Sequence, residues 1–277
     1  MSQLRREIVK ILSRKLTYFG WAGLLVVPVL VSLAVRFSTH RSGPPGMEET
    51  GGGFNFDIAS ASGLYIAIGS IIALSLFLLP MLAAVSGSLT LAGEAEKGTL
   101  RTMLMQPVRR GSVLAAKWLA ANLYVAVGLL ILLASSLIAG GAFFGLKPIF
   151  LVNLDTLSTA GVGEGIGLIL LAYLFAFVAM AAAVSLALLF STLTDSGLTA
   201  MAGAMVLIII MLVLGNISAL GFLRPYFFTS HVLASFNFFR DPIAWEPIRD
   251  ALLNFAVWIA GTTGVAWLIF RRKDIRS

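Results

Sequence analysis

The segment Gly93–Thr99, GEAEKGT, comes closest in this sequence to a chemical motif, because its two glycines have the spacing of a phosphate-binding P-loop. A P-loop needs a lysine directly after the second glycine, and Thr99 occupies that position here. The strand and helix that frame a P-loop are also missing from the surrounding pattern. We therefore expect no nucleotide site in this segment, and any ATP chemistry belongs to another chain.

Other catalytic and metal-binding patterns are missing from the sequence as well. It contains neither the HExxH pair of zinc proteases nor a GxSxG nucleophile elbow. Cysteine is absent, which excludes thiolate metal sites, and the two histidines, His40 and His231, are too few to hold a structural metal without other ligands. The sequence thus predicts no catalytic, cofactor-binding or metal-binding residue, and no enzyme.

The composition instead indicates a protein that lies in a membrane. Of the 277 residues, 58% are hydrophobic and 12% are charged, whereas a soluble domain carries about 25% charged residues. A single core cannot bury this much apolar side chain at this chain length. The composition excludes a soluble globular domain, a disordered chain and a nucleic-acid-binding module.

Six apolar segments are long enough to cross a membrane, since a hydrocarbon core of ~30 Å takes ~20 helical residues. The predicted fold is an all-α membrane protein in which residues 1–277 form one transmembrane domain. The predicted spans are Tyr18–Val35, Gly63–Leu91, Val113–Ala139, Ile166–Phe190, Leu198–Leu220 and Ala251–Phe270.

The basic residues favour an orientation with both termini in the cytoplasm. With the N-terminus inside, the cytoplasmic segments carry 14 of the 20 lysines and arginines, and the outer segments carry the other 6. Basic residues are retained on the cytoplasmic side of a membrane. We therefore expect a multi-pass protein of the cell (plasma or inner) membrane, and the net charge of +7 reflects topology.

The N-terminal residues 1–17 predict an amphipathic helix that lies in the cytoplasmic membrane interface. Apolar residues recur at helical spacing along one side, and basic residues fill much of the rest. A plain basic flank of the first span is the alternative. The basic residues are Arg5, Arg6, Lys10, Arg14 and Lys15.

The connection Gly221–Asp250 is too polar to span the membrane but is rich in aromatic residues. Such aromatics suit the membrane interface, and Pro225, Pro242 and Pro247 interrupt the segment. We expect one or two short interfacial or re-entrant helices between the fifth and sixth spans.

The loop between the second and third spans predicts a short helix from Glu94 to Met105 below the membrane. Such a helix, bracketed by two helices continuous with the bundle, has the form of a lever, with the acidic pair at its tip. An ordinary basic loop is the alternative. The positions concerned are Glu94 and Glu96 in the first turn, Leu100, Met103 and Leu104 on one face, and Pro107 at the end.

This loop resembles the signature of ABC-2 type transporter permeases, the membrane-spanning subunits of ATP-binding cassette exporters. In that family an acidic pair precedes Gly-Thr-Leu, and a leucine, a proline and a basic residue then lead into the third span. The resemblance in motif covers Glu94–Lys117, and the rest of the chain agrees in layout. The matching residues are Glu94, Glu96, Gly98, Thr99, Leu100, Arg101, Leu104, Pro107, Val108 and Arg110.

The resemblance implies a permease that acts as a homo- or heterodimer above two ATP-binding cassette subunits. The predicted helix would couple to the ATPase, and the basic N-terminal helix would be a second docking element. The second and fifth spans would face the partner permease. The chain itself would hold no cofactor, because Mg-ATP binds to the partner subunit; membrane lipid is a further partner, and nucleic acid is not.

Two other classes of function stay open at this point. One is a six-span ion-coupled secondary transporter or channel without an ATPase partner, although the predicted spans carry no Asp or Glu near their centres. The other is a structural or sensory membrane protein that recruits a cytoplasmic partner through the same loop. Lipids, hydrophobic drugs, antibiotics, peptides, polysaccharides and ions all remain candidate substrates.

Overall fold

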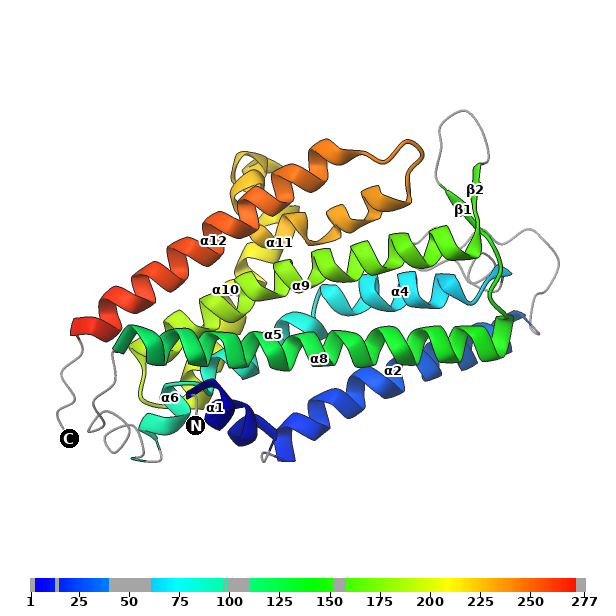
Figure 1. The fold of residues 1–277 in the computed structure, drawn as a ribbon. Helices are drawn as coiled ribbons and strands as arrows, with labels where there is room; N and C mark the ends of the chain where they lie inside the picture. The colour runs from blue at the N-terminus through cyan, green and yellow to red at the C-terminus, as the bar shows by residue number, and fades with distance from the viewer. Residues whose placement is uncertain are drawn as a thin grey trace.

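The structure, a computed structural model, describes residues 3–12, 15–39, 61–96, 98, 110–151 and 158–272. In this part of the chain nearly all regular structure is helical (Figure 1). The exception is a short antiparallel hairpin in which β1 (Ile149–Leu151) pairs with β2 (Ser158–Ala160). The described part of the chain is thus helical, as predicted, apart from this hairpin.

Five of the described helices are long and apolar enough to cross a membrane, and a bent pair raises the number to six if it forms one span. The bent pair is α4 (Leu64–Ser75) followed by α5 (Leu78–Ser88). The five single helices are α2 (Lys15–Thr39), α8 (Arg110–Phe144), α9 (Val162–Leu193), α10 (Gly197–Asn216) and α12 (Trp245–Arg272).

The second predicted span, Gly63–Leu91, differs from the prediction because it is not one continuous helix. Helices α4 and α5 meet at 56° around Leu76 and Phe77. Pro80 lies in the first turn of α5. Its ring has no N–H for the carbonyl of Leu76 and clashes with that carbonyl in a straight helix, so the bend follows from the sequence.

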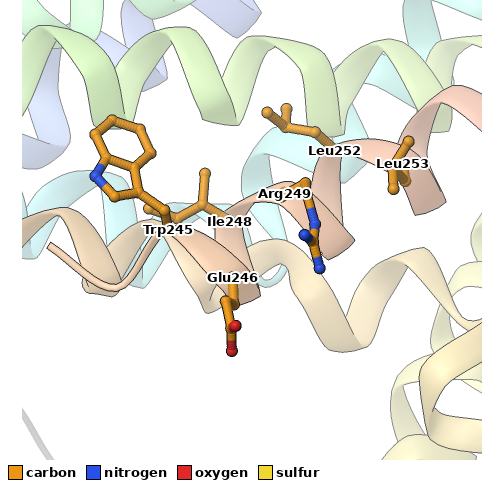
Figure 2. Close-up of a pocket in the computed structure, with 6 residues that line it drawn as sticks. All are labelled: Trp245, Glu246, Ile248, Arg249, Leu252 and Leu253. Carbon is orange, nitrogen blue, oxygen red and sulfur yellow. The ribbon is translucent and has the colours of Figure 1, made fainter.

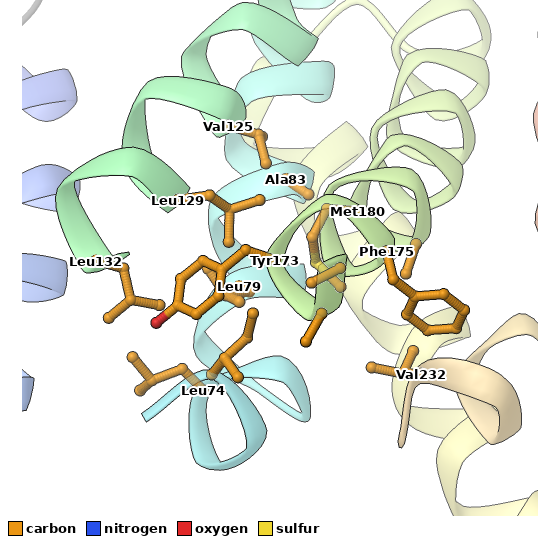
Figure 3. Packing of buried hydrophobic residues seen from close by; sticks show 14 of the residues in the cluster. Leu74, Leu79, Ala83, Val125, Leu129, Leu132, Tyr173, Phe175, Met180 and Val232 are labelled. Atoms are coloured by element: carbon orange, nitrogen blue, oxygen red, sulfur yellow. The ribbon is translucent and has the colours of Figure 1, made fainter. Parts of the chain in front are cut away.

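Helix α9 forms the centre of the bundle and packs against α5, α8, α10 and α12. Small buried side chains such as Ala179, Ala182 and Ala183 allow these neighbours to approach closely. The larger core residues fill the space between α5, α8 and α9, where Tyr173 lies among Leu79, Leu129 and Leu132 (Figure 3).

A close contact between α5 and α9 depends on Gly87. A Cβ atom at this position would lie 2.6 Å from the carbonyl oxygen of Val184. The two backbones therefore touch where α5 approaches its C-terminal end.

The connection between α10 and α12 consists of three short helical pieces, η1 (Ser218–Tyr226), α11 (Phe228–His231) and η2 (Val232–Phe239). Helix α10 ends at Asn216, four residues before the predicted end at Leu220, because Ile217 is extended. The side chains of Asn254 and Trp258 on α12 donate to the carbonyls of Pro225 and Tyr226 at 2.8 Å each. These bonds hold the connection against α12.

The two ends of the bundle are formed by different helices and strands. At one end lie α1 (Gln3–Leu12), α6 (Ala92–Ala95), the start of α8, and the ends of α9 and α12 (Figure 1). We call this the α1 end. The β1–β2 hairpin lies at the opposite end.

Candidate functional site

The junction between α5 and α6, at the α1 end, is bound to the last turn of α9 through one hydroxyl group. The Oγ of Ser191 accepts hydrogen bonds from the backbone N–H groups of Leu91 (3.1 Å) and Ala92 (2.8 Å) and donates to the carbonyl of Ser88 (2.7 Å). Ser191 thus supplies partners for both the end of α5 and the start of α6, where the helices leave their own backbone groups unpaired.

A second anchor of the same junction is the buried side chain of Lys117 on α8. The side chain is 1% exposed. Its ammonium group donates to the carbonyl of Thr90 (2.9 Å) and lies 2.7 Å from Oε1 of Glu94. An ammonium group this deeply buried requires such a carboxylate, because an unpaired charge there is costly. Lys117 therefore links α8, the end of α5 and α6.

The amphipathic helix α1 completes this group of charges. Glu7 Oε1 lies 3.3 Å from Lys117 Nζ, and the ammonium group of Lys10 donates to Glu94. Glu7 and Lys10 also face each other at 4.0 Å within α1. We call Glu7, Lys10, Glu94 and Lys117 the charge cluster.

The charge cluster fixes the ionisation of Glu94. Burial by itself would raise the pKa of this carboxyl group, but the ammonium groups of Lys117 and Lys10 more than offset burial. The pKa of Glu94 is therefore held below its ordinary value, and the side chain is a carboxylate at neutral pH.

Of the two acidic residues, Glu94 is buried and Glu96 is exposed. Glu94 does not lie at the tip of a lever, contrary to the prediction, because its side chain is 3% exposed and paired with two lysines. Glu96 is exposed, and its carboxylate accepts a hydrogen bond from the N–H of Gly197 at 3.0 Å. That N–H belongs to the first residue of α10, so Glu96 stabilises the start of that helix.

One continuous helix from Glu94 to Met105 does not form. Helix α6 ends at Ala95, and Gly98 has φ +68°. A residue with positive φ ends a right-handed helix, and glycine adopts this conformation most readily. Gly98 is not needed for close packing in the described chain, since a Cβ atom there would meet nothing within 4 Å. Thr99–Arg109 lie outside the described residues.

Arg110 links the first turn of α8 to the last turn of α12. Its guanidinium group donates to the carbonyls of Phe270 (3.3 Å) and Arg271 (3.1 Å). A cation suits this place, because the C-terminal end of a helix carries unpaired carbonyls and partial negative charge.

Residues 17–275 match the model of the ABC-2 family transporter protein. The chain belongs to the ABC-2 transporter family. It is therefore a multi-pass membrane component of an ABC transporter. Among curated proteins, no sequence matches the chain significantly.

The match places helix α1 outside the region that the chain shares with the ABC-2 family. The matched residues begin at Thr17, whereas α1 spans Gln3–Leu12. Two members of the charge cluster, Glu7 and Lys10, thus come from a segment that the family match does not cover.

The structure brings some predicted site residues of this ABC-2 permease together and leaves others apart. Lys10, Glu94, Glu96, Gly98 and Arg110 lie at the α1 end, while Arg5 and Arg6 are exposed on α1. Lys15 begins α2. The remaining predicted residues, Arg14, Thr99, Leu100, Arg101, Leu104 and Pro107, lie outside the described residues.

Sequence reasoning missed three residues of the site: Glu7, Lys117 and Ser191. A signal existed for Lys117, which is an isolated lysine within the apolar run from Val113 to Ala121. Ionisable residues in such runs need a partner in the bundle. No comparable pattern distinguishes Ser191 from the other serines of the spans.

Two pockets are lined by residues outside the charge cluster. One, of about 370 Å³, is lined by residues at the start of α12, among them Trp245, Glu246 and Arg249 (Figure 2). The other, of about 260 Å³, lies between α8, α9 and α12 and includes Trp118 and Trp267. Both are mainly apolar, and among the described residues no group of three or more His, Asp or Glu could hold a metal ion.

Proposed function

We propose that the chain is the permease subunit of an ATP-driven exporter, and that it works as a dimer coupled to two separate ATP-binding subunits. The coupling contact is the segment that follows α6, residues 96–110. ATP closes the ATPase dimer, the segment moves with it, and the bundle switches between two states that expose the pathway to different sides.

The observation that carries this proposal is how the α5–α6 junction, from which the segment departs, is bonded to the neighbouring helices. Ser191 binds the α5–α6 junction to α9, and Lys117 binds it to α8. Glu96 binds the start of α10. A displacement of the segment therefore moves α8, α9 and α10 together, because these short hydrogen bonds and ion pairs resist stretching.

Close packing between α6 and α10 supports the same transmission. A Cβ atom at Gly197 would lie 3.5 Å from the Cα of Gly93 and 2.8 Å from the Leu89 side chain. The first turn of α10 thus rests on α6, and neither helix can shift far without the other.

The face of the bundle around the α4–α5 bend fits the contact with a second permease and the pathway between the two. Phe77 at the bend is 57% exposed, and Met81 on α5 is 39% exposed. Helix α10, which packs on α5, exposes Val206 and Ile210. An apolar, charge-poor lining suits lipids, hydrophobic drugs or peptides better than free ions.

The ion-coupled alternative is not favoured by the described spans. A proton or ion relay needs ionisable groups at membrane depth. Glu164 lies in the first turn of α9, and Lys117 lies within the first turns of α8 beside the charge cluster. The described spanning helices carry no Asp or Glu in their middle turns.

The proposal is tested by purifying the tagged chain from its own cells and identifying the protein that accompanies it. We expect an ATPase with Walker motifs, and we expect ATP-dependent export of substrate by the complex in vesicles. The purified chain alone should neither bind nor hydrolyse ATP above background. Saturable hydrolysis by the lone chain, or ATP-independent transport driven by an ion gradient, would contradict the proposal.

A further inference from the structure

The charge cluster is the most deeply buried group of ionisable side chains in the described chain, and its four members come from three elements. Lys117 and Glu94 are 1% and 3% exposed, and they belong to α8 and α6. Glu7 and Lys10 are 14% and 42% exposed, and both belong to α1. The burial thus divides the cluster into an inner pair on the bundle and an outer pair on α1.

Each pair is electrically neutral by itself. Lys117 and Glu94 contact each other directly at 2.7 Å, and Glu7 faces Lys10 at 4.0 Å within α1. Removal of a single charge from a buried group is strongly unfavourable, because the partner stays behind uncompensated. Removal of the neutral Glu7–Lys10 pair avoids that penalty, so α1 can leave and return without leaving an uncompensated charge in the bundle.

Docking of α1 nevertheless adds two contacts to the inner pair. Glu7 adds a second carboxylate to Lys117, at 3.3 Å, and Lys10 adds a second ammonium group to Glu94. Both contacts act on the residues that hold the α5–α6 junction. The docked helix therefore restricts the junction from which the segment after α6 departs.

We propose that α1 is a reversible clamp, which fixes the α5–α6 junction when its Glu7–Lys10 pair is seated on the Lys117–Glu94 pair and frees it when α1 leaves. This inference rests on the proposed function, since the freed junction is the base of the ATPase-coupling segment. Lys117 and Glu94 are then positioning residues for coupling, and α1 belongs to the permease mechanism although the family match does not cover it.

The first test exchanges the two charges of α1 with Glu7→Lys and Lys10→Glu in one variant. The exchange conserves the net charge and the composition of α1, but it places like charges against Lys117 and Glu94. We expect the ratio of docked to undocked α1 to fall about tenfold or more, because hydrogen bonds between charged groups are lost. A second variant adds Glu94→Lys and Lys117→Glu, which restores the attractions among the four side chains, but not the hydrogen bond to the Thr90 carbonyl, and should restore docking.

The measurement is a distance between spin labels in the complete transporter. The chain has no native cysteine, so labels go to Arg6→Cys on α1 and Thr199→Cys on α10, two exposed positions. We expect one distance in the wild-type complex without nucleotide and a second, shifted population when ATP is trapped. The exchanged variant should show the shifted population without nucleotide, and the four-residue variant should return to the first distance.

Coupling is read on the same variants as ATP hydrolysed for each substrate exported. The exchanged variant should hydrolyse ATP while exporting several-fold less, with recovery in the four-residue variant. A matched control inverts the exposed pair Arg249 and Asp250 at the opposite end and should leave both readouts unchanged.

An unchanged label distance in every variant and nucleotide state would overturn the clamp. So would wild-type coupling in the exchanged variant. In either case ATP-dependent export by the wild-type complex would still support the proposed function, whereas failure of the wild-type chain to bind any ATPase would reject the proposed function itself.

Discussion

At the residue scale, the identical side chains of Glu94 and Glu96 have different roles because they lie at different positions in the bundle. Glu94 lies inside and compensates Lys117, whereas Glu96 lies at the surface and accepts from the N–H of Gly197. The spacing of two residues predicted that both would serve one contact surface. The two residues do not share a surface, because the buried Lys117 requires a carboxylate within reach and Glu94 is that carboxylate.

The pH dependence of stability follows from the ionisation of Glu94. A carboxyl group whose pKa is lowered on folding contributes stability above its ordinary pKa, and this contribution is lost as the pH falls through the lowered value. We therefore expect the wild type to unfold at a higher temperature than Glu94→Gln at pH 7, with the difference shrinking below pH 4.5. Thermal unfolding in detergent across this range measures it. A difference that grows in acid would contradict the assignment.

Gly98 offers a second prediction at this scale. Its φ of +68° costs a residue with a Cβ atom about 1–2 kcal/mol, although asparagine tolerates this conformation. Gly98→Leu should thus redirect the segment that follows, and ATP hydrolysis should be uncoupled from transport while membrane insertion stays normal. Gly98→Asn is the matched control and should stay near wild type. Equal transport by all three proteins would show that the turn does not matter for coupling.

At the element scale, the sequence predicted a bundle of long apolar helices, but it did not predict the anchors between them. Apolar length alone identifies α8, α9 and α12. Pro80 is the sequence signal for the bend between α4 and α5, where a single continuous span had been predicted. The hydrogen bonds of Ser191 join residues about 100 positions apart in the chain, and no local pattern reports such a contact.

The contact between α5 and α9 can be tested by adding a single methyl group. Gly87→Ala places a Cβ atom 2.6 Å from the Val184 carbonyl, and overpacking of this kind costs about 1–3 kcal/mol. We expect a lower unfolding temperature in detergent. Gly167→Ala on α9 is the control, because its Cβ atom meets nothing within 4 Å and alanine favours a helix by about 0.5–1 kcal/mol. Equal unfolding temperatures for the two variants would contradict the close contact.

At the scale of the whole molecule, several elements that are far apart in the sequence meet at the α1 end of the bundle. The α1 end gathers α1, α6, the starts of α8 and α10, and the end of α12. The family match makes the chain a membrane component of an ABC transporter, and the α1 end is where we propose that a separate ATPase binds. The orientation of that end remains a prediction from the basic residues.

The orientation can be measured directly, because single cysteines can be placed in a chain that has none. Cysteines at Ser2 and Lys97 should resist an impermeant maleimide in intact cells, whereas a cysteine at Thr50 should react. All three should react in permeabilised cells, which controls for access. Reaction of the Lys97 position from outside would reverse the predicted topology.

The claim that the segment after α6 binds a separate ATPase is tested most directly by placing one charge in that segment. Leu100→Asp puts a carboxylate on the face predicted for Leu100, Met103 and Leu104, and a carboxylate buried there against the ATPase without a partner costs several kcal/mol. Leu146→Asp is the control, since Leu146 is 48% exposed on the connection between α8 and β1, near the hairpin end. We expect pull-down of the ATPase to be lost with Leu100→Asp and retained with Leu146→Asp, at equal expression. Wild-type recovery of the ATPase with Leu100→Asp would contradict the coupling role of this segment.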